Sequence, residues 1–389
     1  MEEILSVENI KKEYGRKGSK HEALRGITFK VYKGEFVGIM GSSGAGKSTL
    51  LNIISTMDLP SSGDIYINGK NTIKMKQNEL ADFRRDNLGF VFQDSNLLDT
   101  LTIKENIELI PRLKKEKSVE EIEKRTLQLL EMVGLDSDEF LNKYPSELSG
   151  GQQQRIGVAR AIATDAEIIL MDEPFSALDP ITRTSLQEQL FSLQDELKKT
   201  IIFVTHDMDE ALKIADKICI MKDGRIAQYD TPENILRKPA NDFVKDFIGE
   251  DRVWDNPEYI KARDIMIKNP IAVNSTRTVT QGIEIMRTSK VDSLLIIDRA
   301  KTLKGIVTVK DMKDIDDKSI LLADIMSSEP LHVNEGDNLV EILNVMNRNS
   351  VGYIPVISDE NKLVGLITRS SLLSVLSEQF LEMEVSVLG

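Results

Sequence analysis

"GSSGAGKST", residues 41–49, decides the fold class of this 389-residue chain. The segment fits the pattern G-x-x-x-x-G-K-[ST], follows the apolar run "EFVGIM" and precedes the helical pattern "TLLNIIS". A glycine-rich loop between a buried strand and a helix binds phosphate, because its backbone N–H groups and the positive end of the helix dipole face the anion. The pattern therefore predicts a nucleotide site on an α/β domain.

Within this phosphate loop the residue types suggest separate tasks. We expect Lys47 to neutralise the β- and γ-phosphates of ATP and Ser48 to ligate Mg²⁺. The candidate ATP-binding residues of the loop are Gly41, Ser42, Ser43, Gly44, Ala45, Gly46, Lys47, Ser48 and Thr49. The alternative is a flexible glycine turn without a ligand, which the flanking strand and helix disfavour.

A second apolar run, "IILMDE" at residues 168–173, ends in two acids. Asp172 at the end of this strand can reach Mg²⁺ directly or through water, and Glu173 is placed to polarise an attacking water. Two acids after a strand also commonly form a helix N-cap. The phosphate loop upstream favours the catalytic interpretation.

Residues 1–240 alternate strand-length apolar runs with helical patterns such as "VEEIEKRTLQLLEMVGL". The apolar runs are "EFVGIM", "LGFVFQ", "EIILMDE", "TIIFVTH" and "KICIMKDG". This alternation predicts an α/β domain with a largely parallel sheet. A polar stretch with two prolines comes next, and we interpret residues 241–262 as a helical connector.

From residue 263 onward the chain repeats itself with an offset of 60 residues. "DIMIKNPIAVN" at 264–274 is echoed by "DIMSSEPLHVN" at 324–334, and "LKGIVT" at 303–308 by "LVGLIT" at 363–368. A single register over such a length indicates a true tandem repeat. Each copy predicts a short lead-in, an amphipathic helix ("VTQGIEIMRTS"; "LVEILNVMNRN"), two strands and a second helix.

Composition excludes several classes of function. A net charge of −13 and a pI near 5.0 argue against a broad nucleic-acid-binding surface, because phosphate backbones are bound by clustered cations. The single cysteine, Cys219, leaves no partner for an internal disulfide and is expected in the core. We expect neither a signal peptide nor a membrane span, so any span must come from other chains.

Residues 1–240 resemble the ATPase subunit of ABC transporters, whose motifs occur here in the family's order. The resemblance implies that Gln93 in "FVFQD" contacts Mg²⁺ and the attacking water, and that His206 in "VTHD" contacts the γ-phosphate. It also implies that Asp179 in "SALD" couples the two sites of a dimer, and that Tyr14 stacks on adenine. Taken singly, Gln93 is equally a surface amide, Tyr14 a core aromatic and His206 a turn residue.

The same resemblance explains "LSGGQ", residues 148–152, which contains no catalytic side chain. This signature segment donates to a γ-phosphate through Ser149, Gly150, Gly151 and Gln152. In the family fold it faces away from the phosphate loop of its own chain. The resemblance therefore implies a head-to-tail homodimer in which each ATP lies between Lys47 of one chain and Ser149 of the other.

The transported solute is the least determined part of the resemblance. Residues 94–147 should form the helical subdomain that receives the membrane permease subunits. "HEALRGITF" and "FRRDNLGFVFQDSNLLDTLTIKENI" resemble ATPases of bacitracin-resistance and lipoprotein-release exporters. By contrast, three later stretches resemble ATPases of glycine betaine and osmoprotectant importers. They are "YPSELSGGQQQRIGVARAI", "FVTHDMDEALKIADKI" and "TPENILRKPANDFVKDFIG". The terminal repeat favours import, with a solute-binding protein as a further partner and a peripheral place at the cytoplasmic face of the membrane.

The repeats, residues 263–318 and 323–380, resemble a pair of CBS domains, which often bind adenosine nucleotides such as cyclic di-AMP. Thr308 and Asp311 match the family's phosphate and ribose contacts; the second copy keeps Thr368 but has Arg369 beside it and Ser371 in the acid position. A purely dimerising role and a sensor of ionic strength remain alternatives.

Two other classes of function also remain open. One is a soluble ABC ATPase of nucleic-acid repair or translation, although the paired ATPase domains or long coiled-coil insert usual in that class are not predicted here. The other is an adenylate sensor that gates an ATPase with no transport role.

Overall fold

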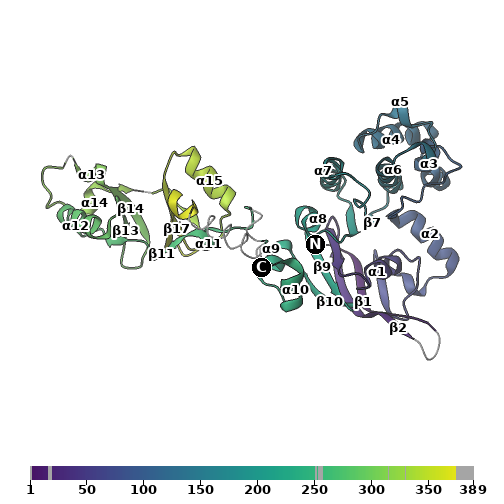
Figure 1. Ribbon diagram of the computed structural model, residues 1–389, viewed down its shortest axis with the longest axis horizontal. Coiled ribbons are helices and arrows are strands. Elements are labelled where there is room, and N and C mark those ends of the chain that lie inside the picture. Colours follow the sequence, from purple (N-terminus) through teal and green to yellow (C-terminus); the bar gives the residue numbers. More distant parts are fainter. Residues whose placement is uncertain are drawn as a thin grey trace, which may run out of the picture. The chain divides into compact units, whose positions relative to one another are not determined.

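A computed structural model shows the arrangement of the chain (Figure 1). It describes residues 2–15, 20–249, 252, 257–313, 315–328 and 330–373. The chain divides into two compact units, Met1–Ile248 and Gly249–Gly389. Among the described residues, no helix is both long enough and apolar enough to cross a membrane.

The described part of the first unit holds a six-stranded sheet in the order β10-β9-β3-β8-β7-β6. All neighbouring strands are parallel except the edge pair of β9 and β10. The strands are β3 (Phe36–Gly41), β6 (Leu88–Val91), β7 (Ile168–Asp172), β8 (Thr200–Val204), β9 (Lys217–Lys222) and β10 (Arg225–Asp230). The predicted, largely parallel sheet is confirmed, because strands buried on both faces read as continuous apolar runs.

An antiparallel sheet in the order β2-β1-β4-β5 completes the frame of this unit within the described residues. Its strands are β1 (Glu3–Tyr14), β2 (His21–Tyr32), β4 (Ser62–Ile67) and β5 (Lys70–Asn71). Helix α1 (Lys47–Ile54) buries Leu50, Leu51, Ile53 and Ile54 in one core that also contains residues of both sheets. Each such side chain stabilises the fold by about 1.5–3 kcal/mol, so the phosphate loop that precedes α1 is held on a rigid base.

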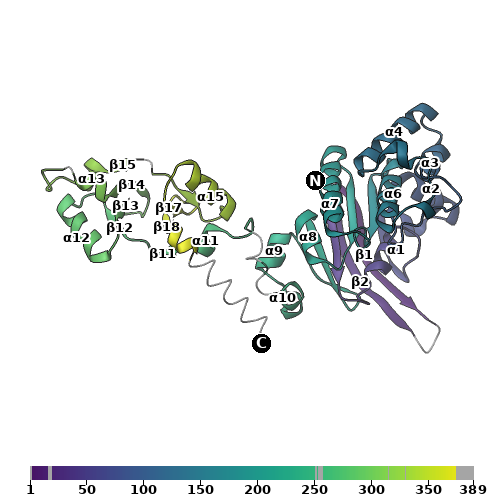
Figure 2. The same ribbon diagram turned by 45° about the horizontal axis from the view of Figure 1, so that its top comes forward.

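The helical part of the first unit contains α3 (Ile103–Lys114), α4 (Val119–Met132), α5 (Ser137–Phe140) and α6 (Gly150–Ala163). Figure 2 shows α3, α4 and α6 close together. Capping boxes begin α3 at Thr102 and α4 at Ser118. Helix α6 packs against α3 and α4. The remaining elements are η1 (Thr72–Lys74), α2 (Gln77–Asn87), η2 (Pro145–Glu147), α7 (Pro180–Leu197), α8 (Met208–Ile214), α9 (Pro232–Arg237) and α10 (Asp242–Ile248).

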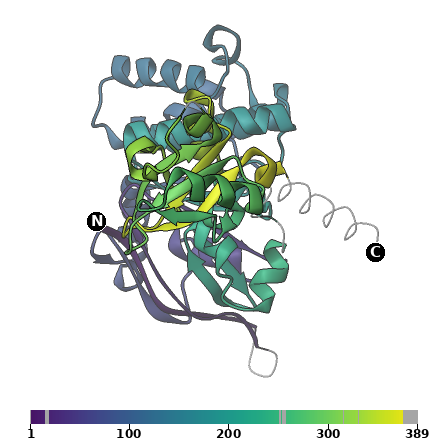
Figure 3. The ribbon, with the colours of Figure 1, turned by 90° about the vertical axis from the view of Figure 1, so that its left-hand side faces the viewer.

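The second unit, green to yellow in Figure 3, contains two four-stranded sheets in its described part, in the orders β12-β13-β14-β15 and β11-β18-β17-β16. The strands are β11 (Ile267–Lys268), β12 (Ala272–Asn274), β13 (Ser293–Ile297), β14 (Leu303–Thr308), β15 (Ser327–Ser328), β16 (Val333–Asn334), β17 (Tyr353–Ile357) and β18 (Leu363–Thr368). The helices are α11 (Ala262–Ile265), α12 (Val279–Ser289), α13 (Val309–Lys313), α14 (Leu322–Ile325) and α15 (Leu339–Arg348). The predicted amphipathic helices correspond to α12 and α15.

The two repeats exchange their lead-in segments. Strand β11, at the start of the first repeat, pairs with β18 of the second, and β15, at the start of the second repeat, pairs with β14 of the first. Correspondingly, Ile260 and Ile265 pack in the core of the second repeat, whereas Leu322 packs in the core of the first. The repeats are therefore interlocked rather than joined end to end. Residues 374–380, the end of the second predicted CBS domain, lie outside the described residues.

Candidate nucleotide-binding site

The phosphate loop runs from the end of β3 to the start of α1. Gly41 and Gly46 have positive φ angles of 149° and 98°, and a Cβ at these positions would lie 2.3 Å from the Met221 carbonyl oxygen and 2.7 Å from that of Ala23. Only glycine fits so close to neighbouring backbone. No side chain caps the first turn of α1, so its N–H groups face the loop. This is an anion cradle at a helix N-terminus.

The cationic and hydroxyl groups of the loop are placed for a nucleotide. The Lys47 ammonium lies over the loop and donates to the carbonyl oxygens of Gly41 and Ser42 at 2.9 and 3.2 Å. Ser48 forms a side-chain hydrogen bond with Asp172, the last residue of β7. Burial and the neighbouring Glu173 raise the pKa of Asp172, because both disfavour a second negative charge there.

Tyr14 ends β1 beside this loop and is 42% exposed, so its ring is accessible to a base. Its hydroxyl donates to Asp58 Oδ2 at 2.8 Å and also contacts the Thr49 side chain. Lys12 Nζ lies 4.9 Å from the ring centroid and 2.6 Å from Asp58 Oδ1. Lys12 and Asp58 thus orient Tyr14 next to the first turn of α1. Neither residue is singled out by the sequence pattern.

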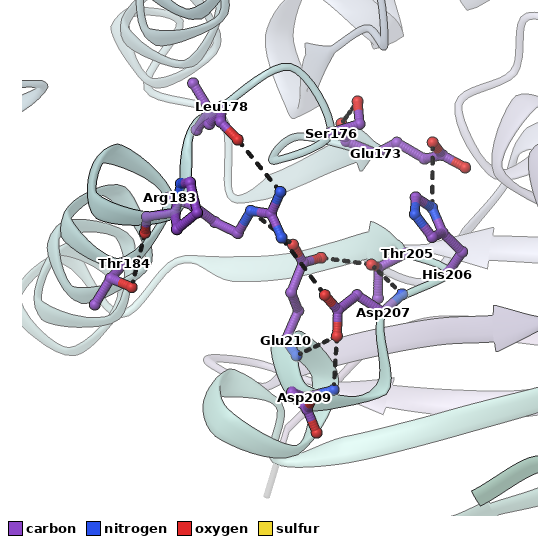
Figure 4. Close-up of polar contacts among 11 residues, drawn as sticks. Glu173, Ser176, Leu178, Arg183, Thr184, Thr205, His206, Asp207, Asp209 and Glu210 are labelled. Atoms are coloured by element: carbon purple, nitrogen blue, oxygen red, sulfur yellow. Dashed lines mark hydrogen bonds and ion pairs between the residues drawn. The ribbon is translucent and has the colours of Figure 1, made fainter.

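Two of the predicted catalytic residues, Gln93 and His206, contact the carboxylate of a third, Glu173. Glu173 follows β7 in a left-handed conformation with a φ of 45°, and its N–H donates to the Val204 carbonyl of the adjacent strand β8. Gln93 Nε2 donates to Glu173 Oε2 at 3.3 Å. His206 Nδ1 lies 3.5 Å from the same oxygen (Figure 4). A strained, fixed backbone is typical of functional positions. The arrangement can hold and polarise a water at Glu173.

Asp179 lies apart from that convergence. It caps α7 by accepting the N–H of Thr182 at 3.0 Å, and hydrogen bonds from Thr182 lower its pKa. The loop that precedes it also contacts the signature segment, because a Cβ on Gly151 would lie 3.1 Å from Leu178. Asp179 and the signature segment are therefore neighbours along this loop.

The signature segment forms the first turn of α6. Ser149 caps the helix in a capping box with Gln152, whose N–H donates to Ser149 Oγ at 3.3 Å. The serine hydroxyl hydrogen remains able to donate to a ligand. A Cβ on Gly150 would meet nothing within 4 Å, so this backbone faces open space. In the described part of the chain, no hydrogen bond joins these residues to the phosphate loop.

The loop that carries Gln93 is held on α6. Arg160 donates to the carbonyl oxygens of Ser95 and Asn96, both at 2.7 Å, and Gln154 Nε2 donates to that of Phe92 at 3.3 Å. Ser95 Oγ in turn donates to Gln153. The residues on both sides of Gln93 are therefore attached to α6. The sequence shows the glutamines of "GGQQQR", but it does not show their partners, which are distant along the chain.

The comparisons with known proteins agree with this geometry. Residues 24–176 match the ABC transporter family, and residues 262–317 and 322–378 match the CBS domain. The glycine betaine/carnitine/choline transport ATP-binding protein OpuCA of Bacillus subtilis (strain 168) is 43% identical over 373 residues, 96% of each chain. The chain belongs to the ABC transporter ATP-binding proteins. It is an ABC-type ATPase with a tandem CBS pair.

Two further similarities extend this result. The carnitine transport ATP-binding protein OpuCA of Listeria monocytogenes serotype 1/2a (strain 10403S) is 44% identical over 96% of this chain and 92% of its own. The ATP-binding cassette MJ0796, solved as a dimer in a post-hydrolysis state bound to ADP and Pi, is 41% identical with a TM-score of 0.56. That match covers 59% of this chain and 99% of MJ0796.

The CBS pair of this ABC ATPase has unequal turns at its two predicted ligand positions. Both threonines accept an N–H on Oγ1, Thr308 from Asp311 at 3.4 Å and Thr368 from Ser371 at 3.0 Å. They differ in that Thr308 Oγ1 donates to the Asp311 carboxylate at 2.8 Å, whereas the Ser371 hydroxyl donates to the Thr368 carbonyl oxygen at 2.9 Å. Tyr353, which the sequence pattern does not single out, contacts the Ser293 side chain. Burial and the nearby Asp292 and Asp311 raise the pKa of Tyr353. Tyr353 thus brings the second repeat next to the candidate contact of the first. Arg369 is exposed.

Proposed function

We propose that the chain energises the import of small quaternary amines of the glycine betaine, carnitine and choline class. The observation that carries this proposal is the match to OpuCA along 96% of both chains, the CBS pair included. The exporter alternative has less support, because this match also covers most of the N-terminal region that resembles exporters. As an ATPase with membrane partners, the chain would act at the cytoplasmic face of the membrane, peripherally, with permease subunits and a solute-binding protein.

Side chains from the start of α1, the loop after β6 and the end of β7 fit Mg²⁺. The hydroxyl of Ser48, the carboxylate of Asp172 and the amide of Gln93 supply the oxygen ligands that Mg²⁺ prefers, and the Ser48–Asp172 hydrogen bond holds two of them together. When bound, Mg²⁺ neutralises charge on the β- and γ-phosphates. Lys47 and the N–H groups of the phosphate loop would hold the same phosphates.

The Glu173 carboxylate would accept a proton from the attacking water. Gln93 and His206, which both contact Glu173 Oε2, would orient that water and the γ-phosphate. A homodimer would supply Ser149 and its neighbours from the second chain, because Ser149 and Gly150 are exposed and, among the described residues, the signature segment has no hydrogen bond to its own phosphate loop. The adjacent Asp179 would then report dimer closure to each site.

We also propose that an adenine nucleotide such as cyclic di-AMP regulates the ATPase through the CBS pair. Thr308 and Asp311 would contact phosphate and ribose in the first repeat, and Thr368 and Arg369 would favour an anion in the second. The Thr308–Asp311 hydrogen bond and the nearby Tyr353 support this proposal, because they bring polar groups of both repeats together. Calorimetry of the full chain with cyclic di-AMP, comparing Asp311→Ala with wild type, tests this proposal.

Uptake measurements test the transport proposal. Cells that lack the wild-type chain and carry its Lys47→Ala variant should lose high-osmolarity uptake of radiolabelled glycine betaine, carnitine or choline. The wild-type chain should restore it. Unchanged uptake of all three, together with increased sensitivity to an exported antibiotic, would favour the exporter.

A further inference from the structure

A cluster of polar side chains joins the start of α7 to the loop between β8 and α8. Its members are Arg183 of α7, Thr205 and Asp207 of the loop, and Glu210 of α8 (Figure 4). None of them is a candidate catalytic or ATP-binding residue. The cluster lies between two segments that carry such residues, Asp179 at the start of α7 and His206 in the loop.

Arg183 contacts both segments with one side chain. Its backbone N–H donates to the Asp179 carbonyl oxygen at 2.8 Å, and its Nη2 donates to that of Leu178 at 3.2 Å. On the other side, Nη1 lies 3.6 Å from Asp207 Oδ2 and Nε lies 3.7 Å from Glu210 Oε1. The planar guanidinium thus spans from one segment to the other.

Arg183 is the cation that faces the buried carboxylate of Glu210. Glu210 is only 7% exposed, and its carboxylate accepts the Thr205 hydroxyl at 2.5 Å. Burial and the neighbouring Asp207 raise the pKa of Glu210, and Arg183 opposes that shift. A buried carboxylate next to a second one is unfavourable without a cation, so Arg183 stabilises the charged form of the cluster.

The backbone on both sides of His206 is fixed by the same groups. The Asp207 N–H donates to Thr205 Oγ1 at 3.0 Å, and the Asp207 carboxylate accepts the N–H of Asp209 at 2.9 Å. Thr205 itself is bound to Glu210. Because His206 lies between Thr205 and Asp207 in the sequence, its position over Glu173 depends on this network.

The contact between Arg183 and Glu210 has an unused donor. Arg183 Nε is buried and makes no hydrogen bond within the described residues. At 3.7 Å from Glu210 Oε1 it forms an ion pair but lies beyond hydrogen-bond distance. A small displacement of the start of α7 toward α8 would therefore create a charge-assisted hydrogen bond at Glu210.

We propose that Arg183 is a positioning residue that transmits movement of the Asp179 segment to His206 through Asp207 and Glu210. The proposal rests on the proposed function, in which Asp179 faces the second chain and His206 acts on the γ-phosphate. Arg183 does not touch the nucleotide. Its role is to align His206 when the dimer closes.

A double-mutant cycle on the purified full-length ATPase tests this role. Arg183→Gln should lower kcat about ten- to a hundredfold, because a catalytic group displaced by about 1 Å loses that order of rate. KM for ATP should stay within about twofold, since substrate binding is not touched. In the His206→Ala background, Arg183→Gln should reduce kcat no further.

The matched control is Arg237→Gln, which removes another partly buried arginine of the same unit that pairs with Glu233 on α9. It should leave kcat unchanged. Arg183→Lys keeps the positive charge but loses the planar guanidinium and its several donors, so it should show an intermediate kcat at wild-type KM. This variant replaces Arg183→Gln in the test if Arg183→Gln does not fold. Fully additive effects of Arg183→Gln and His206→Ala, or a loss of Tm that accounts for the activity, would overturn the proposal. Normal turnover in His206→Ala would instead refute the proposed function.

Discussion

The phosphate loop and the signature segment are both glycine-rich, yet the structure builds them in opposite ways. The glycines of the phosphate loop that pack against backbone carbonyls of other strands, Gly41 and Gly46, have positive φ angles fixed by that packing. Gly150 of the signature segment faces open space at the exposed start of α6. One segment is a finished cradle, whereas the other is a surface that gains its role from a partner.

In the proposed function, this difference lets one sequence make a site that needs two copies of the chain. A cradle that holds phosphate must be rigid before the ligand arrives, since preorganised donors stabilise charge best. A segment that closes over the γ-phosphate must remain accessible until the dimer forms. The backbone packing of Gly41 and Gly46 meets the first requirement, and the exposure of Ser149 and Gly150 meets the second.

Substitution of the catalytic carboxylate has the largest expected effect. Glu173→Gln keeps the contacts with Gln93 and His206 but removes the base, so hydrolysis should fall by about a hundredfold to ten-thousandfold. ATP should then accumulate between the two segments and hold the dimer together. Size-exclusion chromatography with ATP measures this. A monomeric Glu173→Gln variant with normal turnover would contradict both the role of Glu173 and the comparison of the two segments.

Alanine substitutions test whether the backbone is tightly packed in the phosphate loop and open in the signature segment. Gly46→Ala places a Cβ 2.7 Å from the Ala23 carbonyl oxygen at a φ of 98°, and should lower the free energy of unfolding by about 1–3 kcal/mol. Gly150→Ala meets no neighbour and should change that free energy by no more than about 0.5 kcal/mol. Urea unfolding of both variants measures the difference.

The activity of the Gly150→Ala variant sharpens the same comparison. If its backbone must approach a phosphate in the dimer, hydrolysis should fall about tenfold even though the chain is as stable as wild type. Equal stability losses in Gly46→Ala and Gly150→Ala would contradict the distinction between a packed and an open segment.

The smallest expected effect concerns the thiol of Cys219. This residue is fully buried in β9, which pairs with β3 below the phosphate loop, and burial raises its pKa to about 12. Little thiolate is therefore present at about pH 8, and a thiol-specific reagent should react only after denaturation. Faster labelling in Gly46→Ala than in Gly150→Ala would show that strain in the phosphate loop loosens this sheet. Rapid labelling of the native wild-type chain would contradict the packed frame.

The sequence predicts the elements whose pattern is local. The parallel strands and the repeat helices follow from continuous apolar runs and helical periodicity, and residues 41–49 and 168–173 follow from motifs in a fixed context. The antiparallel sheet is not predicted, because its long strands are partly exposed and lack a continuous apolar run. The exchange of lead-ins is not predicted either, since similar segments precede both repeats and either segment fits either repeat.

Most of the other features that the sequence does not predict are contacts between polar or charged side chains that lie far apart along the chain. Arg183 is unremarkable in "DPITRTSLQEQL", and its contact with Glu210 depends on how α7 and α8 meet. The contacts of Tyr14 with Asp58, and of Tyr353 with the first repeat, have the same origin. Each contact joins residues that are far apart along the chain, for which a single sequence gives no signal.

The most direct measurement mixes two inactive chains. Lys47→Ala destroys the phosphate loop and Ser149→Arg destroys the signature segment, so each homodimer should be inactive. Mixed dimers retain one intact site, made of Lys47 from one chain and Ser149 from the other. If chains pair at random, an equal mixture should recover about a quarter of wild-type ATPase activity. Activity in the mixture no higher than in the separate variants would contradict the shared site.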